Sequence, residues 1–269
     1  LKLMAVTKMK TKGLVGALVL ALIAAAVVVK LVLFPSVRDA YFAMDSRKLQ
    51  HVPAGLMVIR PTHFSKSQPN GIIYASSPND GGNGPRIMGC NVPLRSVIAA
   101  AYRQNPARVV MPPDAPQGNF DFLMTVTSDP RQRLQAVIRQ KLGYVAQKET
   151  RDTDVLALKI ADANLPGLTV SGADEKEDVV SKDSKLYFTH MPLAAVAQGL
   201  QQFVKAPVVD KTDLTNFYDF TADWNFKVQR DIRNDTTARA TADQIINALG
   251  LMLQPDTASL EMLVVKKKD

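Results

Sequence analysis

The sequence predicts an α+β protein in which an N-terminal transmembrane helix is followed by two repeated small β-α-β-β-α-β-β modules. Three observations carry this prediction. Residues 13–34 form an apolar run interrupted by a single charge, Lys30. Beyond it, short β-branched or alternating segments are interleaved with segments of helical periodicity. The same order of landmarks then returns later in the chain, which is the pattern of an internal repeat.

The apolar run is long enough to cross a bilayer, because a spanning helix needs about 20 apolar residues. Four lysines and no acidic residue precede it, which fits both a signal peptide and the positive-inside rule. Residues 24–26 are alanines that could form a cleavage site, but apolar residues continue to Phe34. We therefore expect an uncleaved signal anchor in a bacterial inner membrane, with 1–12 as a cytoplasmic basic tail and the rest periplasmic. A cleaved signal peptide is the alternative.

Small residues recur at every fourth position of this run, at Gly13, Ala17, Ala21 and Ala25. Such a stripe lets two helices approach closely in lipid. We take these four residues as candidate helix-contact residues, with ordinary alanine-rich composition as the alternative. Membrane lipid is then one expected partner and another protein is the second.

The positive charge lies at the ends of the chain rather than on its body. The net charge is +8, of which the lysines before and within the apolar run and the C-terminal Lys266–Lys268 account for nearly all. Nucleic-acid binding needs a basic face, so we expect no nucleic-acid partner. The single cysteine, Cys90, excludes an internal disulfide, and its apolar neighbours indicate a buried strand.

Residues 35–85 are expected to form a connector with one strand, 55–60, and a Gly/Pro-rich loop, 65–85. The first α+β module then spans 86–160. Its expected elements are a helix at 95–103, strands at 108–112 and 120–126, a helix at 131–143 that ends on a glycine, and a closing hairpin at 144–160 that turns around 151–154.

Residues 161–185 carry six acidic residues and three lysines without hydrophobic periodicity. This composition favours a solvated acidic linker. A calcium site is the alternative, but the spacing lacks the acidic and glycine pattern of a calcium loop. The second α+β module follows at 186–269.

The second module repeats landmarks of the first. Met191-Pro-Leu193 stands 99 residues after Val92-Pro-Leu94, and an aromatic-Asp-aromatic motif recurs from 120–122 to 218–220 at an offset of 98. Leu-Gly pairs and closing apolar strands recur at an offset of 107, which places an insertion near 225–239. We interpret the prolines as turns into helices and the aspartates as outward-facing strand residues.

Two resemblances follow from these residues. The stretch 191–200, MPLAAVAQGL, with its later Val-Val-Asp strand and Leu-Gly-Leu helix end, resembles the short N-terminal domain of secretins and TonB-dependent receptors. The stretch 209–224, with 148–158 and 245–265, resembles a family of exported soil-bacterial proteins abundant in Acidobacteria. These resemblances imply fold and export rather than a reaction.

No arrangement of residues indicates catalysis. His51, His63 and His190 lack metal-ligand spacing, and none forms a nucleophile motif with Cys90. We therefore predict no catalytic, cofactor-binding or metal-binding residues, no cofactor and no identified small-molecule ligand. The expected function is non-catalytic protein–protein interaction outside the cytoplasm. The alternatives are an accessory structural subunit of an inner-membrane complex, in which the anchor contacts other subunits, and a hydrolase-like enzyme.

Overall fold

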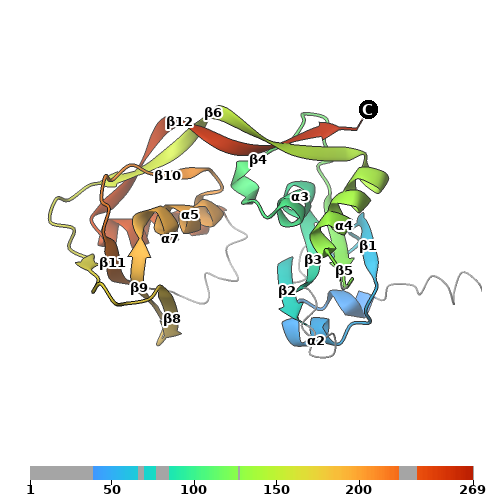
Figure 1. Ribbon diagram of the computed structural model, residues 1–269, viewed down its shortest axis with the longest axis horizontal. Coiled ribbons are helices and arrows are strands. Elements are labelled where there is room, and N and C mark those ends of the chain that lie inside the picture. The colour runs from blue at the N-terminus through green and yellow to red at the C-terminus, as the bar shows by residue number, and fades with distance from the viewer. Residues whose placement is uncertain (1–38, 66–69, 77–84, 127, 224–234, 269) are drawn as a thin grey trace, which may run out of the picture.

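The computed structural model describes residues 39–65, 70–76, 85–126, 128–223 and 235–268 (Figure 1). Within these ranges the chain is α+β, with three four-stranded sheets and five α-helices. The helices are α2 (Ser46–Gln50), α3 (Leu94–Tyr102), α4 (Pro130–Val137), α5 (Leu193–Val204) and α7 (Asp235–Ala248). The strands are β1 (Met57–Pro61), β2 (Gly71–Ser76), β3 (Pro85–Pro93), β4 (Val109–Val110), β5 (Asn119–Met124), β6 (Tyr144–Ile160), β7 (Thr169–Val170), β8 (Asp178–Lys182), β9 (Lys185–Pro192), β10 (Val208–Asp210), β11 (Phe217–Asp223) and β12 (Leu251–Lys267).

The α+β class is confirmed, but the predicted fold of a transmembrane helix followed by two repeated β-α-β-β-α-β-β modules is wrong. The predicted span, 13–34, lies outside the described residues, and no helix within the described ranges is long and apolar enough to cross a membrane. The modules are also not separate units that each close with a hairpin. One of the three sheets is built from strands of both.

That shared sheet has the order β10-β6-β12-β4. Its two central strands, β6 and β12, each run for 17 residues and pair antiparallel along their whole length, from Tyr144 opposite Lys267 to Ile160 opposite Leu251. The short strands join at opposite ends, β10 parallel to β6 and β4 parallel to β12. In Figure 1 the β6–β12 ribbon spans the molecule and connects the two groups of helices and strands.

The predicted hairpin turn at 151–154 is wrong for a physical reason. Arg151, Asp152 and Asp154 are exposed, because the middle of the ribbon lies between the two packed halves, where charged side chains can stay in solvent. Polar composition there reflects exposure rather than a turn. Ion pairs cross the ribbon, including Lys148 Nζ to Glu261 Oε1 and Lys266 Nζ to Glu149 Oε1, both at 2.7 Å.

The remaining elements form two similar halves. The first half comprises the sheet β1-β5-β3-β2 with α3 and α4, and the second comprises the sheet β7-β11-β9-β8 with α5 and α7. Corresponding elements follow the predicted offsets, since α5 begins 99 residues after α3, β11 98 after β5 and β12 107 after β6. The repeat also includes two strands before the predicted start of each module. In the second sheet β7 pairs with β11 and β8 with β9, as β1 pairs with β5 and β2 with β3 in the first.

Residues 161–185, which the sequence predicts as a solvated linker, are part of this extension. They contain β7 and β8, which are the two edge strands of the second sheet. All five residues of β8 are exposed, so their charge and lack of periodicity are those of an edge strand. Helix α4 continues through a π-helical turn, Ile138–Leu142, which ends on Gly143 in the left-handed region (φ 72°), as the sequence predicted. In the second half, Gly250 (φ 74°) lies two residues after α7.

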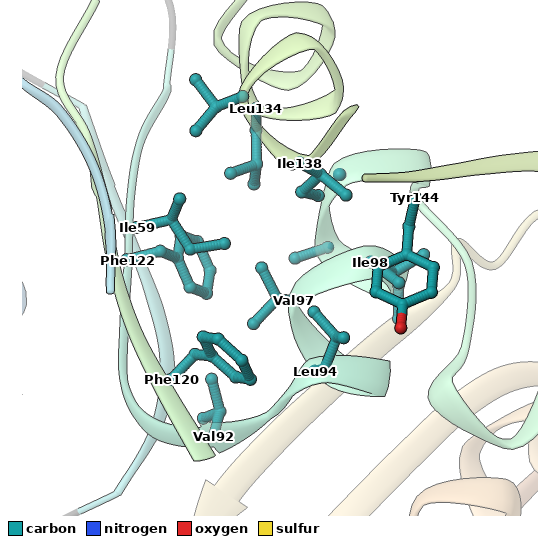
Figure 2. Packing of buried hydrophobic residues seen from close by; sticks show 14 of the residues in the cluster. Ile59, Val92, Leu94, Val97, Ile98, Phe120, Phe122, Leu134, Ile138 and Tyr144 are labelled. Carbon is teal, nitrogen blue, oxygen red and sulfur yellow. The ribbon is translucent and has the colours of Figure 1, made fainter. Parts of the chain in front are cut away.

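Each half has its own core, and each long strand contributes to both. In the first core the side chains of Val97, Phe122, Leu134 and Ile138 converge between the sheet and the helices (Figure 2), and Tyr144 from β6 and Leu263 from β12 complete it. The second core receives Leu158 from the far end of β6 and Leu251 from the start of β12. The β6–β12 ribbon therefore ties the two cores together.

The first sheet is covered on both faces. Helices α3 and α4 pack on one face, and the segment 39–53, which contains α2, packs on the other through Phe42, Leu49 and Val52. Arg86 of β3 donates to the carbonyl oxygens of Leu49 and Val52 and so anchors this segment. Cys90 is buried beneath the segment, as the sequence indicated, and burial is the main cause that raises the pKa of its thiol to about 11.

Candidate interaction surface

The aspartate of the repeated aromatic-Asp-aromatic motif holds a β-bulge in each half. Asp121 accepts the backbone N–H of Asn91 at 2.9 Å, and Asp219 accepts that of His190 at 2.8 Å. Asn91 and His190 both have a positive φ, 51° and 53°, and the strand register shifts beside each aspartate. The aspartate of the motif therefore stabilises a β-bulge in each half. The interpretation of Asp121 as an outward-facing residue is wrong.

In the first half this aspartate is enclosed. The side chain of Asp121 is fully buried, and Arg60 Nε lies 3.3 Å from its Oδ2 while the Arg60 Nη2 donates to Asp39 at 2.7 Å. The guanidinium also lies over the ring of Phe42, 4.9 Å from its centroid. Residues 39–42 therefore cover the bulge as well as the sheet.

In the second half the equivalent carboxylate is only half-buried. The Ser171 hydroxyl donates to Asp219 at 2.5 Å, and this bond, with the His190 N–H, lowers the pKa of Asp219 below its ordinary value. The His190 ring stacks on Phe217 at a centroid distance of 4.1 Å, and its Nδ1 is buried without a hydrogen-bond partner in the described structure. Ser171, His190 and Asp219 are neighbours, but the histidine contributes its backbone and not its ring, which is not the arrangement of a nucleophilic triad.

Because the pKa of Asp219 is lower in the folded than in the unfolded chain, its ionised form stabilises the fold. This contribution is complete above the unfolded pKa and is lost as the pH falls through the folded one. We expect Asp219→Asn to flatten the dependence of unfolding free energy on pH below about pH 4. Urea unfolding of both chains across that range measures it, and identical slopes would contradict the assignment.

The face of the second sheet opposite its helices is not covered by any described segment near β8 and β9. Val180 of β8 and Tyr187 of β9 are paired neighbours on this face and are 48% and 40% exposed. Thr221, opposite Tyr187 on β11, is exposed as well. The corresponding residue to Tyr187 in the first half is Met88, which is buried under the segment 39–53.

Among the described strands, β8 is the edge of the second sheet beside this face (Figure 1). It is joined to β9 by a two-residue turn, Asp183-Ser184, in which both residues have positive φ, as in a type I′ hairpin. Residues next to such a turn form a hydrogen-bonded pair, so Lys182, Val180 and Asp178 direct their backbone groups toward β9. Val179 and Ser181 direct theirs outward. In agreement, the Val179 N–H donates to the Asp178 carboxylate at 2.8 Å instead of to β9.

Two of the hollows among the described residues adjoin the second half. One of about 410 Å³ lies where the halves meet, beside the 2.9 Å bond from Arg108 Nε to Gln201 Oε1. The other, about 210 Å³, is apolar and lies on the helix side of the second sheet, lined by Val179, Phe188 and Phe203 among others. Val179 is 47% exposed, so the helix side of β8 is also only partly covered.

The histidines are scattered in the fold. His51 follows α2, His63 contacts Asp39 at 3.0 Å, and His190 lies at the bulge of the second half. Within the described residues, no group of three or more His, Cys, Asp or Glu side chains is placed to hold a metal ion. The predicted helix-contact residues Gly13, Ala17, Ala21 and Ala25 lie outside the described residues.

Sequence reasoning missed the β8 edge. The pattern that could have revealed it is Asp178-Val-Val-Ser-Lys182, a short β-branched run followed by a two-residue Asp-Ser turn and a second strand beginning at Lys185. The surrounding acidic residues favoured a linker instead.

A family model described as "Protein of unknown function (DUF3738)" matches residues 95–267. The match begins in α3 and ends at the last residue of β12, so it includes both long strands and the whole second half. No curated protein and no solved structure matches the chain.

Proposed function

The chain belongs to the DUF3738 family, and on that premise we propose that it is a non-catalytic binding protein that receives a partner's strand at the β8 edge. One observation carries the proposal: of two equivalent sheets, the first is covered on the face opposite its helices, whereas the second presents an exposed edge strand beside a patch that no described segment covers. The same fold unit thus serves as scaffold in the first half and as binding surface in the second.

Strand addition suits this edge. A free edge offers unpaired N–H and C=O groups, and pairing with a partner supplies affinity through the backbone and specificity through alternate side chains. Val179 and Ser181 provide the outward backbone groups, and Val180 and Tyr187 provide exposed apolar contacts.

Sequence resemblance supports the same role. The second half resembles the short N-terminal domain of secretins and TonB-dependent receptors, and the basic start of the chain with the apolar residues that follow favours action outside the cytoplasm, on the periplasmic side of a bacterial inner membrane. The non-catalytic role is supported by the geometry around Ser171, His190 and Asp219, where the imidazole contacts neither the hydroxyl nor the carboxylate through a hydrogen bond.

The proposal is tested by a photo-crosslinking amino acid placed at Ser181 of the full chain in the cells that naturally make it. We expect a discrete adduct that Val179→Pro abolishes, because proline removes an outward N–H and obstructs an added strand while leaving the β8–β9 bonds intact.

Val170→Pro is the matched control. Val170 is an exposed valine on β7, the opposite edge of the same sheet, and its neighbour Ser171 already donates its N–H to the Phe217 carbonyl. The N–H of Val170 therefore points outward too. An adduct that survives Val179→Pro, or the absence of any adduct from position 181, would contradict strand addition at β8.

A further inference from the structure

We propose that the strand received at β8 is the β8 strand of a second copy of this chain, paired antiparallel about a two-fold axis at Val180. This inference rests on the proposed function and names its partner. Two second-half sheets would then join edge to edge into one continuous eight-stranded sheet, made of two copies of the β7-β11-β9-β8 order.

The charges of β8 are self-complementary in this arrangement. With Val180 opposite its own copy, Asp178 lies opposite Lys182 of the second copy, and Lys182 opposite its Asp178. Within the described residues neither side chain forms an ion pair in the single chain. Opposite charges directly across an antiparallel pair are favourable, and a parallel alignment would instead place like charges together. The order of charges therefore selects the antiparallel register.

The directions of the backbone N–H and C=O groups along β8 agree with the same register. Val179 and Ser181 are the residues whose N–H and C=O groups point away from β9, as the Asp178-bound N–H of Val179 shows. About a two-fold axis at Val180, Val179 of one copy faces Ser181 of the other, so outward groups meet outward groups and form hydrogen-bonded pairs. Val180 then forms a non-hydrogen-bonded pair with its copy, the type in which side chains are closest.

The exposed apolar side chains also become contiguous. Val180 and Tyr187 are cross-strand neighbours on the uncovered face, so two copies align as Tyr187, Val180, Val180 and Tyr187 across the junction. In the single chain, these side chains are exposed to water. Burying them together adds a hydrophobic contribution to the backbone pairing.

Charged residues on an edge strand commonly prevent pairing, and the Asp178 carboxylate occupies the outward Val179 N–H in the single chain. Pairing replaces this local bond with a carbonyl of the second copy and releases Asp178 to contact Lys182. The two charges thus discourage foreign or misaligned strands and permit the one register in which they meet opposite partners.

Sedimentation of the purified full chain over a concentration series tests the inference, using Asp178→Lys and Lys182→Asp. Each single reversal creates two like-charge contacts across the two-fold axis, and we expect self-association weakened about tenfold or more. The double variant D178K/K182D restores opposite charges and is expected to recover association. A mixture of the two single variants should associate more tightly than either alone, because each strand then faces its complement.

Association through any other surface would not be weakened by the single reversals, restored by the double variant and restored again by mixing the two single variants. A native chain that stays monomeric, or an association that ignores the reversals, would overturn the inference. If the Ser181 adduct contains a different protein and depends on the N–H of Val179, strand addition stands and the second copy is excluded. If no Val179-dependent adduct forms, the proposed function itself fails.

Discussion

Replacing Leu263 with alanine is expected to lower the free energy of unfolding by about 2–5 kcal/mol, the usual cost of truncating a fully buried leucine. Leu263 is inaccessible to solvent in the first core, although it belongs to the last strand of the chain, and it pairs with Val109 of β4. Truncation leaves a cavity under α3 and α4, where the surrounding side chains are already close-packed.

The same substitution should also reduce the stability of the second half. Strand β12 begins with Leu251 in the second core, and its partner β6 contributes Leu158, close to its C-terminal end, to the same core. The first half therefore cannot unfold without releasing strands that the second half needs. We expect hydrogen exchange measured by mass spectrometry to accelerate in β9 and β11 as well as in β3 and β5. Protection that falls in β3 and β5 alone would show that the halves unfold independently.

Leu260→Ala is the matched control for Leu263→Ala. It removes the same atoms from the same strand, but Leu260 is only partly buried, in the middle of the ribbon opposite Arg151. We expect it to cost markedly less than Leu263→Ala, because the site opens to solvent and no enclosed cavity remains.

The repeat can be predicted from the sequence because the residues that reveal it act locally. A proline before a helix, a glycine after one and an aromatic pair in a strand recur at offsets of 98 to 107 residues, and the elements of the structure follow those offsets. Local chemistry of this kind decides where an element starts and stops.

The pairing of β6 with β12 could not be predicted from the sequence, because it joins residues up to more than a hundred positions apart, such as Tyr144 and Lys267. Nothing in either strand distinguishes a neighbour in its own module from one in the other. The exposed charges at 151–154 therefore favoured a turn, although they lie in a solvated stretch of continuous strand.

The candidate surface escaped prediction for a related reason. Val180 and Tyr187 become a patch only because no described segment covers them. In the first half residues 39–53 pack on their equivalents, so that Met88 is buried and Ile73 is partly buried. Sequence periodicity reports that a face is apolar, whereas the presence of a covering segment depends on tertiary contacts.

Replacing Asp121 with alanine is expected to lower the free energy of unfolding by about 1–3 kcal/mol, the usual cost of leaving a buried hydrogen-bond donor without its acceptor. The carboxylate is fully buried, accepts the Asn91 N–H and faces Arg60 Nε. Alanine would leave that N–H without an acceptor at a bulge whose residue has a positive φ. The guanidinium would keep its exposed contact with Asp39 and its place over the Phe42 ring.

The second half supplies the control for Asp121→Ala within the same chain. Asp219 holds the equivalent bulge, but it is half-buried and lacks a buried cation among the described residues. Water can replace it at the His190 N–H, so Asp219→Ala should cost clearly less. Asp121→Asn, which keeps an oxygen acceptor but loses the charge, should fall between the two. Equilibrium unfolding in urea ranks the three variants, and equal losses for Asp121→Ala and Asp219→Ala would show that enclosure by residues 39–42 contributes nothing to the aspartate's role.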